Sequence, residues 1–331
     1  MLFLTGAVLV TVVGIVPMVV YALILWWFDR YEREPLPLLT AAFLWGALPS
    51  IIFSILVEVV LDVPISYFTQ PAIADLVGAA LIAPVVEEII KAGALLLLVL
   101  FFRHEINSPL DGIIYGGLVG FGFAAVENIF YFADTLSSSG LGGLGRLVIL
   151  RALVFGLNHA MFTGMTGLGL ALMHTSPHMI VKALAPAAGL ISGITAHAIH
   201  NSSVMLGAEL CWPCVVALIT DWGGVSVLFA IIIFTTFQEH SWLVTFLADE
   251  VELGTLSQAD YRTVCSYIAR VATRMKALLS GDVARWWKLG RYYHLLTELA
   301  FNKYRLSRFP GEAHTRARVT RLRQQVNQMR Q

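Results

Sequence analysis

The chain has 331 residues, of which 57% are hydrophobic and 13% are charged, against ~25% charged residues in an average soluble domain. Together with a mean hydropathy of +0.75, this composition excludes an ordinary soluble enzyme and favours a polytopic membrane protein. The zero net charge hides an asymmetry, because residues 1–239 hold 7 Lys and Arg against 15 Asp and Glu, whereas residues 240–331 hold 15 against 7. We therefore expect a transmembrane domain of residues 1–239 and a basic tail of residues 240–331.

Seven apolar runs are long enough to cross a bilayer core, which takes about 20 helical residues. In chain order they are residues 2–27, 38–62, 74–102, 110–133, 147–173, 184–210 and 213–237. The first run is too long for the apolar part of a signal peptide and has neither a basic segment nor a small-residue cleavage site, so we expect it to be a retained span. The sequence thus predicts an all-α bundle of about seven transmembrane helices.

Charges in the loops predict the orientation, because cytoplasmic loops carry the excess of Lys and Arg. Arg30 and Arg33 follow the first run, Arg103 follows the third and Lys182 follows the fifth, while only Arg146 opposes this trend. We expect an integral protein of a bacterial plasma membrane, with its N-terminus outside and its basic tail in the cytoplasm. Anionic lipid accounts for the charge of the tail, so no nucleic-acid partner is expected.

Two further segments have a distinct composition. Residues 137–145 read SSSGLGGLG, which predicts a flexible connector. After residue 240 apolar and basic residues alternate with helical spacing, so we expect the tail to form two or three cytoplasmic or surface-lying helices. Trp286 and Trp287 are candidates for anchoring the tail to the membrane surface. The last stretch, residues 315–331, is expected to be one more helix or disordered.

Four consecutive runs carry polar residues that a bilayer core tolerates poorly, since an ionisable side chain at mid-span costs about 2.5–3.5 kcal/mol on insertion scales. They are Glu87, Glu88 and Lys91 in the third run, Glu127 and Asn128 in the fourth, Asn158 and His159 in the fifth, and His197, His200 and Asn201 in the sixth. One shared polar cavity would bury all of them, and we predict that this cavity is the functional site.

Helical spacing indicates which of the acidic side chains can meet the lysine. Glu87 and Lys91 are at positions i and i+4, so they can form an ion pair that orients Glu87. Glu88 is rotated by about 100° from Glu87. We therefore expect only one of the two carboxylates to point fully into the cavity.

The residue types indicate the chemistry. A buried glutamate can take a proton from water and return it to a leaving amine, and a neutral His or an Asn amide can donate to an oxyanion. Glu and two His are also ligands of catalytic zinc sites, so both interpretations predict peptide hydrolysis. His197 and Asn201 share one helix face, whereas Lys91, Asn128 and His200 are expected to support the reacting side chains.

The polar motifs, taken in order, resemble those of the PrsW family of intramembrane proteases, relatives of the CAAX prenyl proteases and of bacteriocin-processing enzymes. They are Glu87-Glu88-x-x-Lys91, Phe123-x-x-x-Glu127-Asn128, His159 and His197-x-x-x-Asn201. The likeness covers roughly residues 1–235. In the CAAX proteases the first Glu of the pair activates water, and a His-x-x-x-Asn pair binds the oxyanion. The resemblance therefore implies Glu87 as the base, with His197 and Asn201 as oxyanion donors.

The sequence departs from the CAAX pattern at one position. Glu127 stands where those proteases have a catalytic His, and His159 is the candidate for the missing imidazole. An alternative assignment makes Glu127, His159 and His197 the ligands of a zinc ion, with Glu87 as the base. The predicted catalytic set is Glu87, Glu88, Glu127, His159, His197 and Asn201. Metal dependence is left open between a metal-free glutamate mechanism and a zinc-dependent metalloprotease.

The resemblance implies a membrane-anchored protein as substrate, such as a single-span anti-sigma factor. Two other functional classes stay open at this point. A proton-coupled transporter would also place Glu and His within the membrane, but the sequence shows neither repeated halves nor paired broken helices. A non-catalytic binding or scaffold protein would bind its partner through the basic tail.

Overall fold

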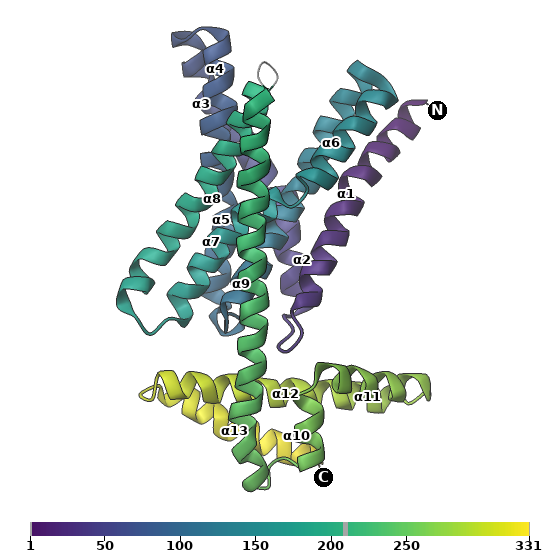
Figure 1. The fold of residues 1–331 in the computed structure, drawn as a ribbon, viewed down its shortest axis with the longest axis vertical. Helices are drawn as coiled ribbons and strands as arrows, with labels where there is room; N and C mark the ends of the chain where they lie inside the picture. Colours follow the sequence, from purple (N-terminus) through teal and green to yellow (C-terminus); the bar gives the residue numbers. More distant parts are fainter. Residues whose placement is uncertain (1, 208–210, 331) are drawn as a thin grey trace. The chain divides into compact units, whose positions relative to one another are not determined.

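The computed structural model describes residues 2–207 and 211–330. Every regular element in these two ranges is helical (Figure 1), which confirms the all-α prediction. The chain divides into two compact units. The membrane unit contains residues 1–28 and 34–232, and the basic unit contains residues 29–33 and 233–331. The functional division predicted at residue 239 stays a prediction.

The membrane unit is a bundle of helices joined by π-helical segments. Its helices are α1 (Leu2–Phe28), α2 (Leu36–Trp45), α3 (Ile51–Phe68), α4 (Pro71–Val77), α5 (Ala83–Phe101), α6 (Pro109–Val148), α7 (Asn158–Thr175), α8 (Met179–Gly207) and the first part of α9 (Cys211–Glu252). The π-helical segments are η1 (Gly46–Ser50), η2 (Gly78–Ile82) and η4 (Ile149–Val154), and η3 (Arg103–Glu105) is a 3-10 turn. Segments of π-helix frequently occur at functional sites. Here η2 precedes α5, which carries Glu87, and η4 precedes α7, which carries His159.

Five helical stretches in the described part of the chain are long and apolar enough to cross a membrane, so the protein is an integral membrane protein. They are Leu4–Phe28, Leu36–Ile65, Pro109–Thr175, Met179–Gly207 and Trp212–Glu252. The predicted number of seven is not confirmed. The predicted runs 110–133 and 147–173 lie within Pro109–Thr175. Residues 74–102 are not among the five because Glu87, Glu88 and Lys91 interrupt their apolar character.

The connector predicted at residues 137–145 is helical instead of flexible. Two helical stretches of α6 meet here at a kink, where Gly140, with φ of 65° and ψ of −165°, leaves the helical conformation. Glycine adopts positive φ without a steric penalty, so one residue redirects the chain. The prediction failed because Leu144 packs against Val10 and Phe132, and this buried contact holds the flanking residues in a helix despite their Ser and Gly content.

Three glycines allow α6 to approach α7 closely. Gly112, Gly116 and Gly120 repeat every four residues, and a Cβ atom at any of them would overlap backbone atoms of α7. At Gly120 the overlapping atom is the carbonyl oxygen of His159. Close packing at small residues is typical of helices in membranes. This seam therefore holds the first turn of α7, and with it His159, next to α6.

The basic unit combines the end of α9 with α10 (Gln258–Val264), α11 (Tyr267–Leu279), α12 (Val283–Arg308) and α13 (Ala313–Arg330) (Figure 1). Its apolar core includes Leu243 and Leu247 of α9, Leu296 of α12 and Leu322 of α13. The last stretch of the sequence, left open between helix and disorder, is therefore helical as far as Arg330, because its apolar side chains pack into this core.

Candidate functional site

Helix α5 presents two adjacent glutamates to one ammonium group. Lys91 Nζ lies 3.0 Å from Oε2 of Glu87 and 2.8 Å from Oε1 of Glu88, and all three side chains are buried. The predicted pair of Glu87 and Lys91 is confirmed. The expectation that only one carboxylate points inward is wrong, because Lys91 is at i+4 from Glu87 and at i+3 from Glu88 and can contact both. The ring of Phe123 lies 3.7 Å from the same Nζ.

His159, in the first turn of α7, is the third hydrogen-bonding partner of the ammonium group. Its Nδ1 lies 3.2 Å from Lys91 Nζ. Because a lysine only donates hydrogen bonds, Nδ1 must accept, and the proton of a neutral His159 ring therefore lies on Nε2. Nε2 is 2.9 Å from Oε2 of Glu127. The hydrogen-bond network thus assigns the tautomer, with Glu127 accepting from His159.

Glu127 is held by a second cation. Arg151 of η4 places Nη2 2.6 Å from Oε2 of Glu127 and donates from Nε to Oδ1 of Asn128 at 2.9 Å. The structure therefore brings Glu127 and Asn128 together with Arg151. Sequence reasoning missed Arg151, although an arginine inside the apolar run 147–173 was the signal that could have found it.

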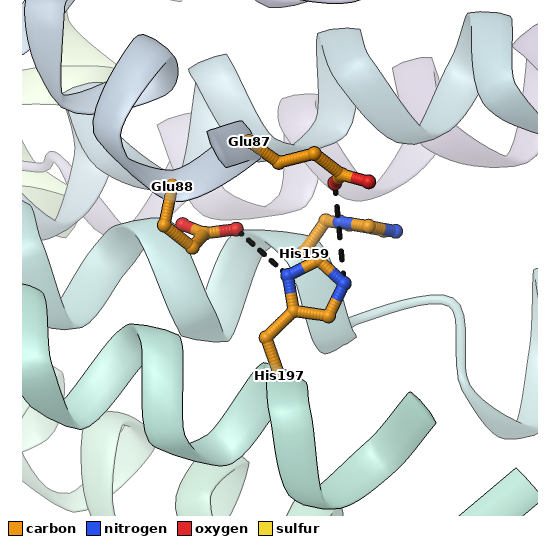
Figure 2. Close-up of side chains that lie close together, drawn as sticks. All are labelled: Glu87, Glu88, His159 and His197. Carbon is orange, nitrogen blue, oxygen red and sulfur yellow. Dashed lines mark hydrogen bonds and ion pairs between the residues drawn. The ribbon is translucent and has the colours of Figure 1, made fainter. Parts of the chain in front are cut away.

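His197 of α8 bridges the two glutamates of α5 (Figure 2). Its Nδ1 lies 3.1 Å from Oε1 of Glu88, and its Nε2 lies 3.9 Å from Oε2 of Glu87. The imidazole stacks on Phe162 with 4.7 Å between ring centroids. Thr163, which sequence reasoning also missed, donates to Oε2 of Glu88 at 2.9 Å. These contacts fix the ring so that Nδ1–H donates to Glu88 and the unprotonated Nε2 faces Glu87.

Four side chains of this network could hold a metal ion. They are Glu87, Glu88, His159 and His197. One ligand atom of each lies within 4.8 Å of all the others, and carboxylates with imidazoles are donors of catalytic zinc sites. A carboxylate commonly orients a metal-binding imidazole through its other nitrogen, and Glu127 stands in that position behind His159. The donor set therefore fits a metal, provided that the ammonium group of Lys91 gives way.

The four residues of this cluster are not the same set as the predicted zinc ligands Glu127, His159 and His197. The two histidines belong to both sets. Glu127 is not one of the four residues of the cluster. Its Oε2 bonds to Nε2 of His159 and to Arg151, whereas Nδ1 of His159 faces Lys91. The structure thus places Glu127 where it orients an imidazole.

Asn201 and His200 lie in other hydrogen-bond networks. Asn201 donates from Nδ2 to the carbonyl oxygen of Ala79 in η2 at 2.9 Å, so its amide joins α8 to the segment before α5. His200 Nδ1 lies 2.7 Å from Oδ2 of Asp221, and Nδ2 of Asn158 donates to the same oxygen at 2.9 Å. Asp221 of α9 is buried. An acid inside an apolar run was the signal in the sequence, but its partners were not predictable.

The fold and the site define a class of protein, namely polytopic helical membrane proteins with a buried cluster of glutamates and histidines. The chain belongs to the PrsW family of intramembrane metalloproteases, whose family model matches residues 34–236. This finding agrees with the resemblance seen in the sequence motifs.

Two curated relatives support the assignment. The chain is 34% identical over 140 residues to "Protease PrsW" of Geobacillus kaustophilus, which covers 42% of this chain and 55% of the relative. It is 33% identical over 123 residues to "Protease PrsW" of Clostridioides difficile, which covers 37% and 50%. The chain thus spans about half the length of the curated relatives it matches. No solved structure matches the chain.

Proposed function

We propose that this protein is an intramembrane endopeptidase that hydrolyses a peptide bond in a membrane-anchored protein. The observation that carries the proposal is the convergence of Glu87, Glu88, His159 and His197 within 4.8 Å, with all but the part-buried His159 fully inside the protein. Charged side chains inside an apolar bundle are costly, so they usually mark function. Membership of the family supports hydrolysis, and the names of the two relatives describe them as proteases.

Glu87 is the proposed general base. Its Oε2 lies 3.9 Å from Nε2 of His197, which is too long for a direct hydrogen bond, and a water beside the two atoms could hydrogen-bond to both. A water bound there would lose a proton to Glu87, which would then return the proton to the leaving amine. Glu88 supports this step by accepting from Nδ1 of His197, which keeps Nε2 turned toward the water.

Negative charge on the attacked carbonyl needs a partner of opposite charge. The predicted donor Asn201 already donates to Ala79, and the network leaves Nε2 of His197 without a proton. A cation in the cluster is therefore the best candidate. In the metal-dependent form, His159 and His197 would hold the ion with a carboxylate of α5, and bound zinc supplies a Lewis acid that polarises the carbonyl and activates water.

A metal-free form is the second candidate, because the ammonium group of Lys91 already lies among the carboxylates. Lys91 would then offset the charge that develops on the substrate. Cleavage of a single-span substrate by the purified full-length protein in detergent separates the two forms. Loss of activity in a strong chelator, with recovery on adding zinc, supports the metal-dependent form, whereas full activity after prolonged chelation supports the lysine form. Proton-dependent uptake in proteoliposomes without any cleavage would overturn the protease proposal.

We also propose that the N-terminus lies outside a bacterial plasma membrane and that the basic unit lies in the cytoplasm. The loop Asp29–Arg33 after α1 belongs to the same compact unit as residues 233–331. Both segments should therefore lie on one side of the membrane, with an even number of crossings between them. The excess of Lys and Arg in residues 240–331 favours the cytoplasmic side. Reporter fusions to either end of the chain test this orientation.

A further inference from the structure

Helix α11 of the basic unit has an apolar face that the structure leaves exposed. The side chains of this face are Ile268, Val271, Met275, Leu278 and Leu279. A rotation of 100° per residue places them on one side of the helix, and Ile268 and Leu279 are 79% and 83% exposed. Val283 and Trp287 at the start of α12 are exposed as well. A contiguous apolar surface of this kind usually marks a binding face.

Two arginines of the same helix have nitrogen atoms without partners. Nη1 of Arg270 and Nε of Arg274 are buried and make no hydrogen bond, although Nη2 of Arg270 donates to the carbonyl oxygen of Tyr31 at 3.3 Å. Neither arginine forms an ion pair with a carboxylate of the described residues. Burial lowers the pKa of Arg270 to about 10, and the nearby charge of Arg33 adds to this effect. Within the described part of the chain, no carboxylate therefore compensates this positive charge.

Both guanidinium groups are held in place before any ligand binds. Arg274 Cζ lies 4.7 Å from the ring centroid of Trp286, and Arg270 Cζ lies 5.7 Å from that of Tyr293. Gly290 of α12 leaves space for Arg274, since a Cβ there would lie 3.0 Å from its Nη2. Groups that are ordered in advance lose less entropy on binding. The pair is thus prepared for an anion with several acceptor oxygens, such as a phosphate group.

We propose that α11 and the first turn of α12 form an interfacial surface that binds anionic phospholipid. The apolar face would enter the acyl boundary, and Arg270 and Arg274 would contact headgroup phosphates. An apolar face flanked by basic residues is typical of helices that lie in a membrane interface, and the exposed Lys276 flanks the other edge of this face.

A lipid membrane is the ligand that we assign to this surface, because the basic unit is joined to membrane-spanning helices. The loop Asp29–Arg33 directly follows α1, and α9 contributes residues to both units, so the basic unit is covalently tied to two apolar helices. Residues 240–331 also carry 15 Lys and Arg against 7 Asp and Glu, which attracts the unit to an anionic leaflet. The surface is separate from the Glu and His cluster and does not depend on the proposed activity.

Hydrogen exchange of the full-length protein in nanodiscs tests the proposal. Discs of phosphatidylcholine alone are compared with discs that also contain phosphatidylglycerol. The amides of residues 267–279 are expected to exchange roughly tenfold more slowly in the anionic discs. The double variant Arg270→Gln/Arg274→Gln should lose this protection, and so should Ile268→Ser/Leu279→Ser, which leaves the charge unchanged. Unchanged exchange in the core of α12 shows that each variant is folded.

The matched control is Arg316→Gln/Arg321→Gln, which removes the same charge from α13 and should keep the protection. The proposal is overturned if the wild-type amides exchange equally in both discs, as they would if the face awaited a protein partner. It is also overturned if the control variant loses as much protection as Arg270→Gln/Arg274→Gln, since binding would then depend on net charge alone. Equal protection by inorganic phosphate in neutral discs would assign the arginines to a soluble anion instead.

Discussion

Nε2 of His159 lies 2.9 Å from Oε2 of Glu127, so the first turn of α7 is bonded directly to α6. The glycine seam makes this contact possible, because a side chain at Gly120 would overlap the backbone of His159. The bond also orders the site, since it directs Nδ1 of His159 toward Lys91. Glu127 therefore positions the imidazole of His159 on a neighbouring helix. It does not itself have to perform the role of the His that the CAAX proteases have at its position.

We expect Glu87→Gln to lower the cleavage rate roughly 10²- to 10⁴-fold, the usual contribution of a general base. The amide keeps the shape of the side chain and can still accept from Lys91, but it cannot take a proton from water. The measurement is turnover of a single-span substrate by purified protein. Glu252→Gln, at the exposed end of α9, makes the same chemical change and should leave turnover intact. Full cleavage by the Glu87 variant would remove Glu87 from the mechanism.

Glu127→Gln is expected to act through His159. Loss of a carboxylate that orients a metal-binding histidine typically costs 10- to 100-fold in metal affinity or activity. We expect kcat to fall while KM stays constant, and zinc affinity, measured by competition with a chelator, to fall in parallel. Asp134→Asn, at an exposed position of α6, is the control. A change in KM alone would indicate that Glu127 contacts substrate.

Asp221→Ala should loosen the start of α7. Oδ2 of Asp221 accepts from both His200 and Asn158, and Asn158 directly precedes His159. Removing the carboxylate leaves the part-buried Nδ1 of His200 without this acceptor, while Nδ2 of Asn158 keeps only its 3.0 Å contact with the same ring nitrogen. A polar group left unpaired in this way costs about 1–3 kcal/mol. We expect a lower unfolding temperature together with reduced turnover, whereas Asp221→Asn, which keeps one acceptor oxygen, should recover part of both. The exposed change Asp75→Asn provides the comparison, and a stable variant with unaltered turnover would show that Asp221 does not position His159.

Glu250→Gln tests the core of the basic unit. The carboxylate is fully buried and lies 2.6 Å from Lys303 Nζ and 2.7 Å from Arg323 Nη2. Removing the charge leaves Arg323 without its carboxylate, whereas Lys303 keeps its ion pair with Asp249 at 2.5 Å, and the loss of a buried ion-pair partner should cost on the order of 3 kcal/mol. Limited proteolysis should then cut residues 240–331 faster, while exchange at α5 stays unchanged. Equal proteolysis of the variant and the wild type would contradict this assignment.

Local spacing accounts for the predicted contact between Glu87 and Lys91, which the structure confirms. Glu87 and Lys91 are one helical turn apart, so their contact follows from the sequence as soon as α5 is helical. The inward position of Glu88 depends on His197 and Thr163, which arrive from other helices. Arg151 was missed because it reads as one charge in an apolar run, and its partner Glu127 lies 24 residues earlier in the chain.

Composition and apolar periodicity by themselves determined that this protein is a helical membrane protein, because burial in lipid requires long apolar helices whose backbone bonds are satisfied internally. They also identified the glutamates and histidines that do not suit such helices. Only the tertiary structure decided which atoms meet. Contacts between helices depend on close approach at glycines and on single breaks such as Gly140, and these are set by packing between distant segments. For that reason the sequence singled out Glu127 as a candidate, while its contacts with Arg151 and His159 emerged only from the fold.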